Sequence, residues 1–355
     1  MIRVAALTGG RNTPSTRFRI RQHIPSLQSQ GIQVTEYCPF ISQHVTLPGF
    51  LGRIRLRYLP PVAAAQVTGN LMARIPGILG SRKSDITWIE RNFLPGFESL
   101  VKTTKRPRVL DVDDAIWMSH LLGRQSLLRL LKNVDTLIAG NRFLADWFSK
   151  YCRKVHEVPT AIDCSRFRPK NSRESVAEDE SFVIGWTGTF VNFRYLVHIE
   201  NALAKFLCDH SKASLLIIAD RRPRFRLIPQ ERVSFMPWDP VTETEGLHQM
   251  DVGIMPLTED DWSRGKCSFK MLQYMASALP VVVSPVGLNQ DILAQGECGL
   301  APQNGGEWYD ALSALHRDPA LRSSLGNKGR RLAEMKYDLP IISSQLTALF
   351  KEIIP

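Results

Sequence analysis

Two lysines, a serine and a glutamine lie close together in a segment that is predicted to be helical, residues 266–278. In such a helix Lys266, Lys270 and Gln273 stand at positions i, i+4 and i+7 and share one face, while apolar residues occupy another. Ser268, near the helix start and its free backbone N–H groups, suits a phosphate. A solvated face that happens to carry two lysines is the alternative interpretation.

Three carboxylates follow an apolar stretch that is predicted to be a strand, residues 108–112. At the end of such a strand Asp111, Asp113 and Asp114 can accept a hydrogen bond or a proton from an acceptor hydroxyl. In the alternative interpretation, one of them caps the next helix and another pairs with an arginine. The sequence leaves both open.

The first predicted strand ends in two glycines, Gly9 and Gly10, which allow the chain to turn closely at that point. Cations follow in the next loop and helix, and Arg17 is the preferred contact for an acceptor or a phosphate. A solvent-exposed role for Arg17 stays open. Three further cations of this segment are expected to face a cleft between domains: Arg11, Arg19 and Arg21.

Short apolar runs alternate with segments of helical period along the whole chain, which predicts an α/β fold with parallel sheets. Ligands of such sheets bind at the carboxyl ends of the strands. The predicted strands are Arg3–Leu7, Ile32–Tyr37, Asp85–Glu90, Arg108–Val112, Thr136–Ala139, Val155–Val158, Phe182–Trp186, Ser214–Ala219, Val233–Phe235, Val252–Met255 and Val281–Ser284.

A polar stretch, residues 168–180, interrupts this series and predicts a linker between two domains. Residues 1–167 are expected to form one Rossmann-like domain, and residues 181–337 a second one. Residues 338–355 are expected to form a helix that packs back on the N-terminal domain. The chain has no apolar run of about 18 residues and only scattered cysteines, which favours a cytoplasmic protein.

The positive charge is concentrated in the N-terminal half. Residues 1–170 hold 26 Lys and Arg against 11 Asp and Glu, and residues 171–355 hold 19 against 23. Such a distribution favours an anionic partner, although a solvated basic face explains it as well. No known nucleic-acid-binding motif is present, so we do not expect nucleic acid as a partner.

Residues 47–59 carry apolar side chains at helical spacing, with Arg53, Arg55 and Arg57 among them. This pattern fits a helix that lies on an anionic membrane, and it equally fits a helix packed on its own core. We therefore expect a cytoplasmic protein that could be peripheral on the cytoplasmic face of the membrane.

The segment around Ser268 resembles the donor motif of the family 4 retaining glycosyltransferases, of the group 1 type. The resemblance covers nearly all of residues 182–340. Its parts are Ile184–Thr189, Tyr195, Ser268, Gln273–Ala276, Leu279–Val283, Gly287, Asn289, Gly296–Ala301, Glu307–Leu312, Asp318–Arg322 and Leu325–Arg330. Weaker matches in the N-terminal half are Pro14–Arg19, Asp111–Trp117 and Gly140–Ala145.

The sequence departs from the family pattern at the donor site. The paired glutamates of the family would fall at Gly265 and Gln273, and Gln273 can still bind ribose hydroxyls as a neutral group. Thr189 takes the place of a family arginine, and Arg194 stands near the place of a family lysine. The resemblance therefore implies a diphosphate clamp made of Arg194, Lys266 and Lys270, and the donor-binding residues expected beside them are Gly188, Thr189, Ser268, Gln273, Gly287 and Asn289.

The resemblance implies the GT-B architecture, two Rossmann-like domains that face each other across a cleft. Residues 1–167 would bind the acceptor and residues 181–337 the nucleotide-sugar donor. It implies a retaining, hexosyl-type transferase that moves a sugar from a nucleotide-diphosphate donor to a glycan or a lipid-linked acceptor, without a metal or another cofactor. Lys270 would stabilise the leaving diphosphate, and Asp113 and Asp114 would contact the acceptor hydroxyl. The alternatives are a catalytically impaired GT-B protein that binds an anionic polymer and a GT-B nucleotide-sugar epimerase.

Overall fold

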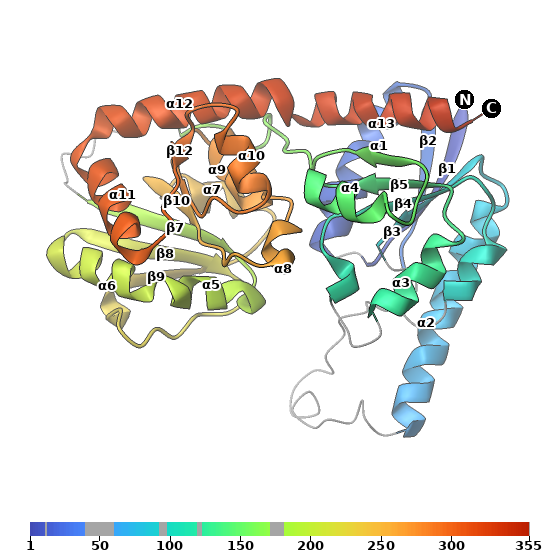
Figure 1. Cartoon of the computed structure of the whole chain (residues 1–355), viewed down its shortest axis with the longest axis horizontal. Coiled ribbons are helices and arrows are strands. Elements are labelled where there is room, and N and C mark those ends of the chain that lie inside the picture. The colour runs from blue at the N-terminus through green and yellow to red at the C-terminus, as the bar shows by residue number, and fades with distance from the viewer. Residues whose placement is uncertain (11–12, 40–59, 92–97, 119–122, 171–180, 355) are drawn as a thin grey trace. The chain divides into compact units, whose positions relative to one another are not determined.

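The computed structural model describes residues 1–10, 13–39, 60–91, 98–118, 123–170 and 181–354. The chain forms two compact units (Figure 1). Unit 1 consists of Met1–Ala161 and Pro340–Pro355, and unit 2 of Ile162–Leu339. The division after Ala161 corrects the boundary expected at residue 167, because Phe167 is buried in the core of unit 2. Of the predicted linker only residues 168–170 are described.

Unit 1 is built on a parallel sheet of six strands in the order β2-β1-β3-β4-β5-β6. The strands are β1 (Ile2–Leu7), β2 (Ile32–Tyr37), β3 (Ile86–Glu90), β4 (Arg108–Val112), β5 (Thr136–Ala139) and β6 (Val155–Glu157). Every residue of β3, β4 and β5 is buried, which is typical of parallel strands covered on both faces. The short apolar runs of the sequence are therefore confirmed as strands.

Helices of unit 1 surround this sheet (Figure 1). They are α1 (Ile24–Ser29), α2 (Pro60–Ser81), α3 (Gly123–Leu131), α4 (Arg142–Phe148) and α13 (Leu339–Ile353), with short helical turns η1 (Thr16–Ile20), η2 (Arg21–His23), η5 (Glu98–Thr103) and η6 (Ile116–Met118). The C-terminal α13 packs on this unit: the ring of Phe350 lies edge-on to Trp88 at 5.1 Å between centroids. His23 Nδ1 and Ser343 Oγ are 2.8 Å apart and both residues are buried.

Unit 2 repeats the plan with a parallel sheet in the order β12-β11-β10-β7-β8-β9. Its strands are β7 (Phe182–Gly188), β8 (Ala213–Ala219), β9 (Val233–Pro237), β10 (Val252–Met255), β11 (Val281–Val283) and β12 (Gly299–Leu300). The last of these, with two residues, is absent from the sequence prediction. Side chains alternate along β8 between two cores: Leu215 and Ile217 enter one, and Leu216 and Ile218 enter the other.

Unit 2 covers both faces of this sheet with helices. They are α5 (Phe193–His198), α6 (Glu200–Asp209), α7 (Glu243–Leu247), α8 (Asp261–Arg264), α9 (Phe269–Ala276), α10 (Leu288–Leu293), α11 (Gly305–Arg317) and α12 (Pro319–Lys336), with turns η8 (Phe190–Asn192) and η9 (Gln230–Arg232). Within the described parts of the chain, no helix has both the length and the apolar character needed to cross a membrane. The helix predicted over residues 47–59 lies outside the described residues.

Candidate functional site

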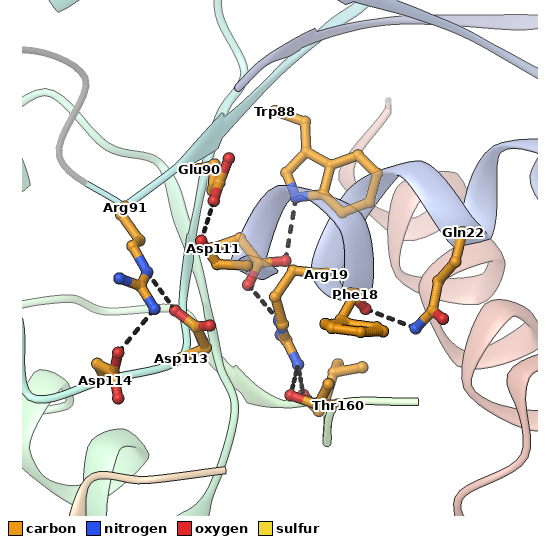
Figure 2. Close-up of polar contacts among 12 residues, drawn as sticks. Phe18, Arg19, Gln22, Trp88, Glu90, Arg91, Asp111, Asp113, Asp114 and Thr160 are labelled. Carbon is orange, nitrogen blue, oxygen red and sulfur yellow. Dashed lines mark hydrogen bonds and ion pairs between the residues drawn. The ribbon is translucent and has the colours of Figure 1, made fainter. Parts of the chain in front are cut away.

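The carboxyl ends of β3 and β4 in unit 1 carry a cluster of charged side chains (Figure 2). Asp111 and Arg19 form an ion pair of 2.8 Å, and their side chains are only 1% and 3% exposed. The indole N–H of Trp88 donates to the other oxygen of Asp111 at 3.2 Å. Arg19 also donates to the carbonyl of Val158 at 2.9 Å. The expectation that Arg19 faces a cleft between domains is therefore wrong, because its side chain is buried inside the unit and bound by a carboxylate there.

Asp111 remains ionised at neutral pH. Burial raises its pKa to about 6, although the charge of Arg19 and its hydrogen bond act in the opposite direction. The side chain of Asp111 is only 1% exposed, so the acceptor capacity that Arg19 and Trp88 leave is not open to a substrate. Asp111 therefore organises this end of the sheet.

Asp113 and Asp114 both pair with one arginine (Figure 2). Arg91, just after β3, binds Asp113 through Nε and Asp114 through Nη2, the latter at 2.7 Å. Burial would raise the pKa of Asp113, but the charge of Arg91 and its hydrogen bond hold it below the ordinary value. Of the two interpretations of these carboxylates, the pairing with an arginine describes their geometry. A carboxylate stabilised in this way is a weak base, which suits binding a hydroxyl more than removing its proton.

The glycine turn after β1 is organised by Glu90, a buried carboxylate that the sequence prediction did not assign to the site. Glu90 accepts from the backbone N–H of Gly9 at 2.7 Å and from the hydroxyls of Ser15 and Thr16. The sequence signal that could have identified Glu90 as a site residue is its position at the end of an apolar run. The N–H of Gly9, one of the two predicted glycines, is therefore already bound by Glu90.

Arg17 lies on η1, half-buried, with its guanidinium carbon 4.7 Å from the centre of the Phe18 ring. Arg21, the next cation on this segment, pairs with Glu36 at 2.7 Å. The arginines of this segment therefore do not share one partner: Arg19 and Arg21 each form an ion pair within unit 1. Arg11 lies outside the described residues.

In unit 2, the predicted donor helix is shorter than expected. Helix α8 ends at Arg264, and α9 begins only after Ser268, which adopts a left-handed backbone with φ of 50°. The prediction of a single continuous helix over residues 266–278 is therefore wrong, and Lys266 lies in the connection between α8 and α9. The interruption creates a new helix start at Phe269, where backbone N–H groups have no carbonyl of a preceding turn to bind.

Ser268 places a buried hydroxyl at this helix start. The residue is 2% exposed, and among the described residues its Oγ has no hydrogen-bond partner. A buried hydroxyl without a partner costs free energy unless a ligand completes it. Helix N-termini favour anions through their N–H groups and the helix dipole. The position therefore fits a phosphate oxygen.

Gly287 is half-buried and directly precedes α10, and Asn289 lies in the first turn of that helix. A Cβ at Gly287 would meet the carbonyl oxygen of Arg264 at 2.7 Å, so glycine is required by the close approach of two backbone segments. Asn289 is fully buried and donates to the carbonyl of Ser284 at 3.1 Å. Both residues shape the connection between β11 and α10.

Lys270 extends from α9 over the end of β7. Its ammonium lies 5.7 Å from the centre of the Trp186 ring, within the range of a cation–π contact. A Cβ at Gly188 would stand only 2.8 Å from Cε of Lys270. The glycine predicted in the donor loop thus makes room for the predicted lysine.

Arg194 and Lys266 converge on Tyr195. The guanidinium carbon of Arg194 lies 4.8 Å and the ammonium of Lys266 5.7 Å from the centre of this ring. Arg194 also donates to the Tyr195 hydroxyl at 2.8 Å. Two of the three predicted clamp cations are therefore brought to one aromatic side chain. Thr189 directly precedes η8 and accepts from Asn192 at 3.0 Å.

Gln273 is buried and contacts a carboxylate that the sequence prediction missed. Its Nε2 donates to Oε1 of Glu243 at 2.7 Å. Glu243 comes from α7, a short helix whose sequence carries no motif, so only the structure could reveal the pair. Among the residues that the structure describes, no three His, Cys, Asp or Glu side chains are grouped as a metal site.

Comparison with known proteins adds two findings. Residues 181–318 match the family model described as "Glycosyl transferases group 1". No curated protein sequence matches the chain.

Solved structures match over almost the whole chain. Sucrose-phosphate synthase from Thermosynechococcus elongatus is similar with a TM-score of 0.70 at 15% identity, covering 99% of each chain. HepE of Anabaena in complex with UDP-glucose is similar with a TM-score of 0.68 at 13% sequence identity, and the match covers 99% of this chain and 100% of that one. A glycosyltransferase from Rickettsia africae is similar with a TM-score of 0.68 at 14% sequence identity, and the match covers 99% of this chain and 98% of that one. At such identities the likeness concerns the fold, and it confirms the predicted GT-B fold.

Proposed function

We propose that this chain, a GT-B protein whose residues 181–318 match the group 1 glycosyltransferases as its motifs predicted, transfers a sugar from a nucleotide-diphosphate donor to an acceptor. Unit 2 binds the donor and unit 1 binds the acceptor. The observation that carries this proposal is the hydroxyl of Ser268, buried and without a partner among the described residues, at the start of α9. Its surroundings suit a diphosphate better than any neutral ligand.

Positive charge near this helix start supplies the catalytic contribution of the protein. As the bond between sugar and phosphate breaks, negative charge grows on the diphosphate oxygens, and fixed cations stabilise that state more than the bound donor. We assign this role to Lys270, with Lys266 and Arg194 as the other cations of the clamp. All three groups come from the protein itself.

The acceptor is proposed to be a glycan or a lipid-linked sugar, with an acceptor hydroxyl bound near Asp113 and Asp114. HepE supports the donor assignment, because that protein was solved with UDP-glucose. A hexosyl donor and retention of the anomeric configuration are further parts of the proposal. They follow from the similarity of unit 2 to the retaining family.

The test is an assay with UDP-, GDP- and ADP-sugars in which release of the nucleoside diphosphate is followed by chromatography. One donor should be consumed, and Lys270→Met should lower turnover by about a hundredfold or more while the fold is retained. NMR of the product then reports the anomeric configuration. If Lys270→Met turns over at the wild-type rate with saturating donor, Lys270 is not in the site.

We also propose contact with the cytoplasmic face of an anionic membrane, supported by helix α2. Its only charged residue is Arg74, which is buried. Met72, Ile75 and Leu79 are 61%, 49% and 53% exposed at positions i, i+3 and i+7, so they form one apolar stripe. Exposed Arg82 and Lys83 follow directly after the helix. Apolar side chains next to cations are typical of a helix that lies at a lipid interface.

Cosedimentation with vesicles of phosphatidylglycerol and phosphatidylcholine tests this contact. Replacing Met72, Ile75 and Leu79 by Ser should reduce the bound fraction. Replacing the exposed Met335 of α12 should leave it unchanged. Wild-type protein that stays in the supernatant at low salt would end the membrane proposal.

A further inference from the structure

The amide of Gln273 is held in one orientation by Glu243. A carboxylate accepts hydrogen bonds but does not donate them, so the NH₂ end of the amide must face Glu243. The contact is 2.7 Å long and both side chains are buried. The carbonyl end of the amide, Oε1, is thereby directed away from Glu243, and no hydrogen bond to it is found among the described residues.

Glu243 is itself fixed by donors from two further parts of unit 2. Arg166 pairs with its Oε2 at 2.8 Å, and the indole N–H of Trp238 donates to its Oε1 at 3.0 Å. Arg166 is held in turn by the carbonyl of Pro240. A buried carboxylate with an ion pair and two neutral donors cannot rotate without losing these contacts.

This arrangement places a negative charge one side chain away from the position where the similar family carries a glutamate. The family residue would offer a charged acceptor at position 273. In this chain the hydrogen-bond acceptor at position 273 is the neutral carbonyl oxygen of Gln273. The carboxylate that orients this amide is Glu243 of α7. The hydrogen-bonding capacity toward a hydroxyl is kept, although the residue type has changed.

We propose that Glu243 is a positioning residue, which holds Gln273 so that its carbonyl oxygen accepts a hydrogen bond from a ribose hydroxyl of the donor nucleotide. This inference rests on the proposed function and names the group that unit 2 recognises in the nucleoside. The loss of charge at position 273 is compensated by a second residue that no motif contains. An amide at position 243 can donate as well as accept, so it no longer fixes which end of Gln273 it meets; with the NH₂ end turned to the ribose, the proton of the ribose hydroxyl has no acceptor at position 273.

Isothermal titration with UDP, GDP and ADP, and with the 2′,3′-dideoxy form of the tightest of them, tests the inference. Wild type should prefer the ribose form by about tenfold, the effect of about one hydrogen bond. Glu243→Gln should lose that preference while it binds the dideoxy form as wild type does. Gln273→Glu should weaken binding of the ribose form, because it sets two carboxylates against each other.

The exchange variant, Glu243→Gln with Gln273→Glu, separates positioning from folding. It restores one carboxylate and one amide in contact, so the ribose preference should return to within about threefold of wild type. Thermal unfolding of each variant shows that it is folded. A ribose preference that survives in Glu243→Gln, or that stays absent in the folded exchange variant, overturns the inference alone. If none of the three nucleotides binds to wild type, the proposed function fails with it.

Discussion

The ammonium of Lys270 and the ring of Trp186 are held 5.7 Å apart over the end of β7, beside Gly188. The lysine stem fills the space where any other residue at position 188 would carry its side chain. A cation that is proposed to meet the leaving group is therefore positioned by an aromatic ring and by the absence of a neighbouring Cβ.

Gly188→Ala should disturb this arrangement. Its Cβ would stand 2.5 Å from the Trp186 ring and 2.8 Å from Cε of Lys270, so at least one of them must move. We expect a loss of about 1–3 kcal/mol in the free energy of unfolding, measured with urea, because overpacking forces side chains out of their preferred rotamers. Gly305→Ala is the control, since in the described part of the chain no atom beyond its chain neighbours and its own helix backbone lies within 4 Å of the place that its Cβ would take. Equal effects of the two changes would contradict the packing described for Lys270.

The buried pair of Arg19 and Asp111 should be important for the stability of unit 1. Asp111→Asn leaves the guanidinium of Arg19 buried without its counter-charge, and we expect a loss of about 3–5 kcal/mol. Arg142 and Asp146 form a matched control, because they pair at 3.0 Å on an exposed helix face. Arg142→Ala should change the free energy of unfolding by less than about 0.5 kcal/mol. Similar losses of unfolding free energy in Asp111→Asn and Arg142→Ala would show that burial of the Arg19–Asp111 pair is unimportant for stability.

The buried His23 should make the free energy of unfolding depend on pH. Burial first, and then the charge of Arg19, lower its pKa from 6.5 to about 3. Between these values the unfolded chain binds a proton at His23 and the folded chain does not. The stabilisation from this group is therefore complete above pH 6.5 and is lost as the pH falls toward 3, by at most about 1.4 kcal/mol per pH unit.

His23→Asn should reduce the slope of unfolding free energy against pH between pH 6 and 4, as measured by urea denaturation. Asp111 titrates in the same window with the opposite sign, because its pKa is raised, but it is present in both proteins and cancels in the comparison. His156→Asn, on β6 of the same unit, serves as the control. An unchanged slope in His23→Asn would mean that His23 is not buried as described.

The sequence predicts strands well in this chain because apolar runs of parallel strands are buried on both faces. It fails where one residue changes the path of the backbone: the left-handed conformation of Ser268 divides a segment whose apolar spacing looks continuous. It also fails for side chains paired over long sequence distances. Arg19 resembles an exposed cation in the sequence because Asp111, its partner, lies in another part of the chain. Glu243 belongs to no motif and is recognised only by its contact with Gln273.

Unit 2 is proposed to bind a nucleoside diphosphate at the start of α9, and replacing the hydroxyl of Ser268 tests this binding. Ser277, at the other end of α9, is also buried with a hydroxyl that lacks a partner among the described residues. Replacing either serine by Ala should not lower stability, because no hydrogen bond is removed. Isothermal titration with UDP, GDP and ADP should show about tenfold weaker binding for Ser268→Ala and wild-type binding for Ser277→Ala. Equal affinities of Ser268→Ala and wild type for every nucleotide would contradict diphosphate binding at the start of α9.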